Sequence, residues 1–165
     1  MTSEKVAKIG MFTALAMIFG YIETLIPLNF GVPGMKLGLS NIVTVTALYV
    51  MGAGPALAVT VLRIFLVSMT FGNMAALMYS LAGGLLSFLG MALLKKAKGF
   101  SVVGVSILGG ALHNTGQLAV AMAVVENIRL ASYLPVLLIG GTATGFLIGL
   151  ASARIIPRLR KAEHA

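Results

Sequence analysis

Four polar side chains stand inside long apolar stretches of the sequence and are the residues best suited to do chemistry there. Arg63 is the only charged residue between positions 37 and 94, and His113, Asn114 and Gln117 follow one another in a later apolar stretch. Their i,i+3 and i,i+4 spacing places these three on one side of a helix. Arginine offers a fixed fork of donors, and imidazole and amide groups donate or accept. Together they predict a binding site for an anionic or acceptor-rich small molecule.

The composition predicts that these residues lie inside a membrane. The 165-residue chain is 59% hydrophobic and 10% charged, with a mean hydropathy of +1.03, whereas soluble domains have about 45–50% apolar and about 25% charged residues. A water-soluble fold of this size could not bury so much apolar surface. We therefore expect a multi-pass protein of the bacterial cytoplasmic membrane that is surrounded by lipid.

Apolar runs and turn signals predict an all-α membrane protein with six transmembrane helices. A spanning helix needs about 20 largely apolar residues. Turn signals at 52–55 (GAGP) and 71–73 (FGN) divide the longest apolar run. The prediction is a single integral membrane domain, residues 1–165, without a soluble module. Its helices span about residues 6–27, 37–51, 54–70, 73–94, 101–125 and 133–155.

Most of the cations fall in short polar segments that six crossings would bring to one side. The positive-inside rule makes that side the cytoplasm, with both termini there. This placement accounts for the net charge of +8, so nucleic acid is not an expected partner. Nine of the twelve cations follow the pattern: Lys5, Lys8, Lys95, Lys96, Lys98, Arg154, Arg158, Arg160 and Lys161.

The depth at which Arg63 is expected makes it costly. A charge at the centre of a membrane helix costs about 2.5–3.5 kcal/mol on the insertion scale, so its presence calls for a partner or a function. Two interpretations stay open: an ion pair with Glu23 or Glu126, or a contact to a bound anion. The polar face that contains His113 also has two interpretations. It is either a ligand site or a set of interhelical hydrogen bonds, worth about 0.6 kcal/mol each. We favour the site.

A further candidate precedes the second predicted helix. Residues 31–41 contain three glycines and a proline, and irregular backbone near a membrane is tolerated mainly where it lines protein or water. The predicted topology places Lys36 on the outer side, where it is either a solvated lysine or a ligand contact. Asn41 begins the helix and is either a capping residue or a ligand contact.

Missing residue types exclude several activities. The chain has no cysteine and no aspartate, and its only acidic residues are four glutamates. Prenyl transfer requires an aspartate-rich Mg²⁺ site, and ATP hydrolysis requires a GxxxxGK[ST] loop. No second metal ligand stands at ligand spacing from His113. We therefore expect no catalytic residue, no metal and no cofactor, and any ATP-driven step would need another subunit.

Three motifs carry a resemblance to a known family. They are PGMKLGLSNI at 33–42, Gly54-Pro55 opening a helix that contains Arg63, and GALHNTGQ at 110–117. With them, over nearly its whole length, the chain resembles the Gx transporter family, also labelled heptaprenyl diphosphate synthase component I. That family is similar to the substrate-binding S components of energy-coupling factor (ECF) transporters. The resemblance implies a six-helix S-component-like bundle that works with a transmembrane coupling subunit and ATPase subunits.

The chain departs from the S components at informative positions. Where many of them carry aspartates it has Gly38 and Asn41, so their ligand contacts do not transfer. Their first helix docks the coupling subunit through an A-x-x-x-A pattern. The corresponding face here offers small residues in the same spacing, and the resemblance implies docking through Gly10, Ala14, Ala16 and Gly20.

These observations together predict a membrane-embedded substrate-binding subunit of an ECF-type importer. Its solute would be a small anionic or acceptor-rich metabolite, such as a vitamin or a quinone or isoprenoid precursor. A non-catalytic accessory subunit of prenyl diphosphate synthesis, or of a membrane redox complex, is the alternative. The predicted solute contacts are Lys36, Asn41, Arg63, His113, Asn114 and Gln117.

Overall fold

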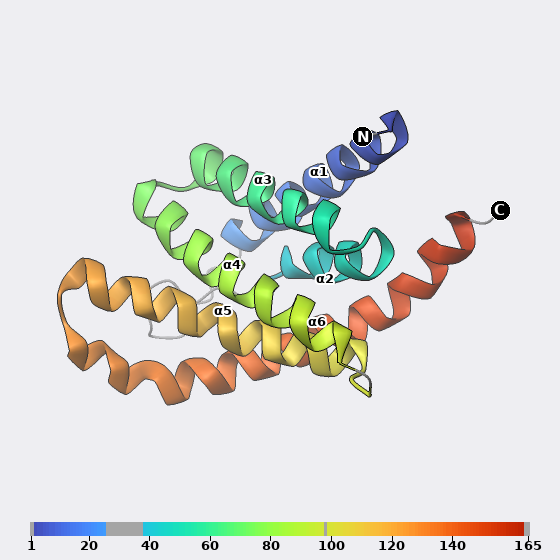
Figure 1. Cartoon of the computed structure of the whole chain (residues 1–165). Coiled ribbons are helices and arrows are strands. Elements are labelled where there is room, and N and C mark those ends of the chain that lie inside the picture. Colours follow the sequence, from blue (N-terminus) through green and yellow to red (C-terminus); the bar gives the residue numbers. More distant parts are fainter. Residues whose placement is uncertain (1, 26–37, 98, 164–165) are drawn as a thin grey trace.

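A computed structural model of the chain describes residues 2–25, 38–97 and 99–163 (Figure 1). All regular structure in these ranges is helical. Six α-helices and one 3₁₀ helix follow one another along the chain. They are α1 (Ser3–Leu25), α2 (Asn41–Val50), α3 (Ala53–Phe71), α4 (Met74–Lys96), α5 (Val102–Val125), the 3₁₀ helix η1 (Ile128–Tyr133) and α6 (Leu134–Glu163).

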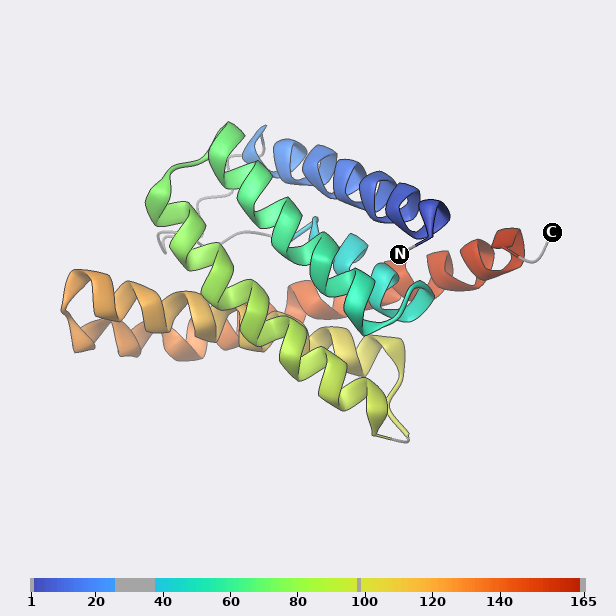
Figure 2. The same ribbon diagram turned by 45° about the horizontal axis from the view of Figure 1, so that its top comes forward.

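The helices form one bundle in which the short α2 is enclosed by longer neighbours. α3 packs between α1 and α4, and α5 packs between α4 and α6. α2 contacts α1, α3 and α6. In both ribbon views α5 and α6 run side by side in opposite directions (Figures 1 and 2). A site inside this bundle therefore draws its side chains from several helices.

Four segments of the described chain are long and apolar enough to cross a membrane: Ser3–Glu23, Ala53–Phe71, Met74–Lys96 and Ile128–Ala162. α5 has the length, with 24 residues, but its polar run at 113–117 lowers its apolar character. α2 has 10 residues and a length of about 15 Å at 1.5 Å per residue, half of a typical hydrocarbon core. The predicted all-helical membrane protein is confirmed, whereas the count of six crossings stays a prediction.

Helix ends differ from the sequence prediction in two places. α6 was expected to end at residue 155, but it continues through Pro157 to Glu163. Proline removes one backbone hydrogen bond of a helix; here the helix persists because Ile156 is buried and Leu159 packs against the core. In the described residues α2 begins at Asn41, after a turn; residues 26, 27 and 37, which the predicted helices included, lie outside the described ranges.

Glycines bring the backbones of α5 and α6 into contact. Gly141, Gly145 and Gly149 recur every fourth residue on α6. A Cβ atom on Gly110 of α5 would lie 2.1 Å from the Gly141 carbonyl oxygen, so no larger residue fits. Ser106 Oγ donates to the Gly145 carbonyl at 2.7 Å. Such small-residue contacts are typical of membrane helices, and they fix the rotation of α5 that orients its polar side chains.

The carboxyl end of α2 is held by cations from two other helices. Lys95 Nζ on α4 donates to the Leu48 carbonyl oxygen at 2.5 Å and lies 4.9 Å from the centre of the Tyr49 ring. Arg160 Nη2 on α6 donates to the Tyr49 carbonyl oxygen at 2.8 Å. These bonds satisfy carbonyls that a helix end leaves without intrahelical partners, and they place positive charge at the negative end of the helix dipole.

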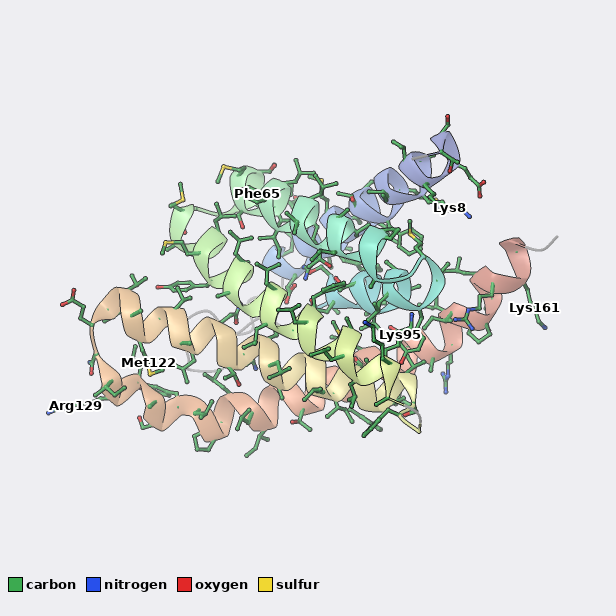
Figure 3. The ribbon with its side chains drawn as sticks, viewed as in Figure 1. Lys8, Phe65, Lys95, Met122, Arg129 and Lys161 are labelled. Atoms are coloured by element: carbon green, nitrogen blue, oxygen red, sulfur yellow. The ribbon has the colours of Figure 1, made fainter. Side chains whose placement is uncertain are left out.

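The two ends of the bundle differ in charge. Lys8, Lys95 and Lys161 lie toward one end and Arg129 lies at the other (Figure 3). The first turn of α1 and the last turn of α6 lie on this same side (Figures 1 and 2). The cations thus collect at the end that also holds the termini, as a positive-inside arrangement would require.

Candidate functional site

Arg63 is buried at the centre of the bundle and bonds to the start of α2. It lies midway along α3 and is 7% exposed. Its Nη1 donates to Ser40 Oγ at 2.5 Å and its Nη2 donates to Asn41 Oδ1 at 2.7 Å. The chain reverses at Gly52, which has a φ of +86°. Asn41 and Arg63 are equally far from this turn in the sequence, so antiparallel packing of α2 and α3 brings them level.

A polar cavity of about 40 Å³ adjoins the guanidinium group. A single water needs about 10–15 Å³ by the same measure, so the cavity has room for a few water molecules and is too small for an organic solute. Side chains from α1, α3, α4 and α5 line it together with the start of α2. Its polar lining consists of Glu23, Ser40, Asn41, Arg63, Ser68, Ser80 and His113.

A second, smaller cavity of about 10 Å³ lies between α2, α4, α5 and α6. Gly38, Asn41 and His113 line both cavities. The side chains between the two spaces are therefore those of Asn41 and His113. The second space is large enough for one water and is lined by the hydroxyl residues Ser87, Ser106 and Thr144.

Glu23 brings a carboxylate into the larger cavity. Its Oε1 accepts a hydrogen bond from the backbone N–H of Gly38, whose φ of +72° favours glycine. Glu23 and Arg63 interact electrostatically. Of the two acidic residues considered as partners of Arg63, Glu23 shares its cavity, whereas Glu126 is exposed at the far end of α5. The described part of the site thus holds the carboxylate of Glu23 together with the guanidinium of Arg63.

The polar face predicted on α5 is divided among three neighbours. His113 lines both cavities and so faces the site. Asn114 lines the smaller cavity, is 5% exposed, and its Nδ2 donates to the Leu137 carbonyl oxygen of α6 at 2.8 Å. Gln117 lines neither cavity and lies against Gly83 of α4. The structure therefore brings His113 close to Arg63 and uses Asn114 as an interhelical hydrogen-bond donor.

Lys36 lies outside the described residues, so its predicted contact with a solute stays a prediction. The structure adds Glu23, Ser40, Ser68 and Ser80 to the site. Only Glu23 carried a signal in the sequence, as a charge near the end of an apolar run. Serines are common in membrane helices as packing residues, so their types and spacing alone could not distinguish a cavity from a helix contact.

The docking face expected on α1 is divided in a similar way. Gly10 and Ala14 are exposed, and no atom lies within 4 Å of the position that a Gly10 Cβ would take. Ala16 is fully buried. A Cβ on Gly20 would lie 3.0 Å from Val67 of α3. The first small pair is therefore available on the outside of the bundle, and the second packs α1 onto α3.

The assembled groups are suited to binding an oxyanion or a hydrogen-bond acceptor. Arg63 supplies a planar fork of donors, and His113 and the serine hydroxyls supply further donors nearby. No three residues of the types His, Cys, Asp and Glu come together within the described ranges. The charged and polar groups converge on an internal space, the usual arrangement of a small-molecule site.

Comparison with known proteins identifies the family. A family profile described as heptaprenyl diphosphate synthase component I matches residues 12–155. The match includes every polar residue that lines the two cavities. Searches of curated proteins and of solved structures find no match to this chain. The chain therefore belongs to the heptaprenyl diphosphate synthase component I family, the family that its motifs resemble.

Proposed function

We propose that this protein is the substrate-binding membrane subunit of an ECF-type importer and takes up a small anionic or acceptor-rich solute. The observation that carries the proposal is Arg63, a 7% exposed arginine midway along an apolar helix and beside an internal polar cavity. A charge at such a position costs about 2.5–3.5 kcal/mol on the insertion scale. Intramembrane ionisable residues of this kind typically mark a solute path.

The position of the cavity along the bundle supports uptake from outside. We propose six crossings of the bacterial cytoplasmic membrane, with the cation-rich end and both termini in the cytoplasm. Glu23 and Ser68 line the cavity near the ends of α1 and α3, and Ser80 lines it near the start of α4. All three lie toward the cation-poor end. In this topology the cavity belongs to the outer half of the membrane.

The proposed role requires partner subunits. The sequence has no GxxxxGK[ST] loop, so ATP hydrolysis would come from separate ATPase subunits. The exposed pair Gly10 and Ala14 on α1 offers a face on which a helix of a coupling subunit can approach closely. Release of the solute would follow from a conformational change that these partners drive.

The family's name favours a second candidate, a non-catalytic accessory subunit of a heptaprenyl diphosphate synthase. The chain has no aspartate with which to build the Mg²⁺ site of prenyl transfer, so catalysis would belong to a partner. Affinity purification from native membranes separates the two candidates. Paired ATPases and a coupling subunit support the importer, and a prenyl synthase subunit supports the accessory role.

The binding role is tested by mass spectrometry of small molecules that co-purify with the protein. Wild type is compared with Arg63→Ala and with Arg158→Ala, a matched control at an exposed position of α6. We expect an anionic or acceptor-rich molecule with wild type and with the control, and its loss from Arg63→Ala. Retention of the same molecule by Arg63→Ala at the wild-type level would reject Arg63 as the binding group.

A further inference from the structure

The two terminal nitrogens of Arg63 are occupied by neutral oxygen atoms of α2. Nη1 bonds to Ser40 Oγ and Nη2 bonds to Asn41 Oδ1, at 2.5 Å and 2.7 Å. Two adjacent acceptors on a guanidinium fork imitate the pair of oxygens that a carboxylate or phosphate presents. Hydrogen bonds from arginine to an anionic oxygen are about twice as strong as those between neutral groups. An incoming oxyanion would therefore displace both side chains.

One N–H donor of the guanidinium has no acceptor among the described residues. Arg63 Nε is buried and has no hydrogen-bond partner among the described residues. An arginine with five N–H donors can hold an oxyanion and still satisfy other acceptors. Since a buried donor without an acceptor is unfavourable, a ligand with several oxygens gains from this nitrogen as well.

The cavity is too small for an organic solute while the side chains of Ser40 and Asn41 stay on Arg63. At about 40 Å³ it admits a few waters and no organic molecule. Asn41 lies between this cavity and the second one, because it lines both. If its side chain turns away from Arg63, part of the boundary between the two spaces is removed, with His113 as the remainder. Removing the α2 acceptors from the fork therefore vacates the guanidinium and enlarges the site in one step.

The amino end of α2 has no side-chain cap of its own. Ser40, its N-cap, makes no side-chain capping bond, and Gly38 precedes it with a φ of +72°. Its carboxyl end is held by Lys95 and Arg160. The bonds from Arg63 are therefore the polar contacts that join the amino end to α3, and their loss would free the side chains of Ser40 and Asn41 while Val43 and Thr44 stay buried.

We propose that the solute is recognised through a terminal carboxylate or phosphate that replaces Ser40 Oγ and Asn41 Oδ1 on Arg63. This inference rests on the proposed binding function and changes the role expected for Asn41. Asn41 competes with the solute for the guanidinium and does not contact it. Its side chain holds the empty site closed, and the solute opens the site by exchange.

Two substitutions of Asn41 with opposite expected effects test this proposal. Asn41→Ala removes the competing acceptor, so oxyanion binding tightens by about tenfold. Asn41→Asp supplies an anionic competitor with a charge-assisted bond to Arg63, so binding weakens by about tenfold or more. Asn73→Ala is the matched control, because Asn73 caps α4 and accepts from Ala76 N–H at 2.8 Å, away from the site. The Asn73→Ala variant should bind the oxyanion with the affinity of wild type.

The probes are acetate and inorganic phosphate, titrated against purified protein while the thermal unfolding midpoint is followed. A response to acetate alone assigns a carboxylate, a response to phosphate alone assigns a phosphate, and either supports the exchange if the two variants shift in opposite directions. Arg63→Ala should remove the response. Size-exclusion chromatography verifies that each variant is folded, and the isosteric Asn41→Asp retains the shape of the native side chain.

Different results would contradict the exchange on Arg63 and the binding function of the site. If Asn41→Ala weakens binding as Arg63→Ala does, Asn41 contacts the solute and the exchange is wrong while the binding function stands. The exchange is equally wrong if both Asn41 variants bind as wild type does. If neither probe stabilises wild type or Asn41→Ala, recognition through an oxyanion is wrong. If Arg63→Ala binds the probes with wild-type affinity, the binding function at this site fails as well.

Discussion

The two ends of α2 are both contacted by cations, but in opposite electrostatic settings. At the carboxyl end, Lys95 and Arg160 donate to backbone carbonyls, where the helix dipole is negative and a cation is stabilising. At the amino end the dipole is positive, and Arg63 contacts the side chains of Ser40 and Asn41. A cation at the amino end gains nothing from the dipole. The first arrangement serves stability, and the second calls for a functional explanation.

Removing the charge at each end should separate binding from stability. We expect Arg63→Met to weaken the binding of the probe oxyanion by about 100-fold, because an anion in a buried site loses a charged, hydrogen-bonding partner. Lys95→Met should leave the affinity unchanged. Titration calorimetry of both variants measures the affinity. A similar loss of affinity in the two variants would show that the two ends of α2 do not differ in function.

The charge of Glu23 sharpens the comparison at the amino end. Glu23→Gln keeps an oxygen for the Gly38 N–H bond and removes the negative charge near Arg63. For an anionic solute we expect affinity to rise by on the order of 1 kcal/mol, the scale of a single charge interaction in a polar setting. A fall in affinity would instead indicate a solute that also carries a positive group. The same titrations, with Glu4→Gln as an exposed control, decide between these outcomes.

At the carboxyl end the expected effect is on stability. Lys95→Met loses the bond to the Leu48 carbonyl and the contact with the Tyr49 ring. We expect the free energy of unfolding to fall by about 0.5–1 kcal/mol. Denaturation in detergent measures this fall, and an unchanged free energy of unfolding would contradict the role assigned to Lys95.

The smallest effect is expected from a reporter at the held end. The chain has no cysteine and no tryptophan, so a single introduced group gives an unambiguous signal. A fluorophore attached to Leu39→Cys, beside the amino end, should respond strongly to the probe. The tryptophan of Tyr49→Trp, at the carboxyl end, should change its emission little. Equal responses at both positions would mean that α2 moves as a whole.

The sequence alone predicted where the helices lie along the chain better than how each helix is rotated about its own axis. The helices follow from apolar runs, which each segment carries in its own residues. The face that α5 turns to its neighbours depends on backbone contacts such as that of Gly110 with Gly141, and these join segments far apart in the chain. That is why the sequence could not show that Asn114 bonds to α6 while it lines the smaller cavity beside His113, or that Gln117 lies against α4.

The contact of Arg63 with the start of α2 could have been predicted from the sequence. The turn at Gly52 and the equal distances of Asn41 and Arg63 from it place the two residues level on antiparallel helices. Two other features were not accessible. Helix α6 continues past Pro157 because Ile156 and Leu159 find tertiary contacts, and Ala16 and Gly20 are buried because α1 packs on α3. Both depend on packing partners that spacing does not reveal.

The central claim is that the cation at the amino end of α2 binds the solute and the cations at the carboxyl end do not. Native mass spectrometry of the protein released from detergent tests it most directly, with wild type, Arg63→Met and Lys95→Met purified in parallel. We expect a bound small molecule on wild type and on Lys95→Met and none on Arg63→Met. An equally occupied Arg63→Met protein would contradict it.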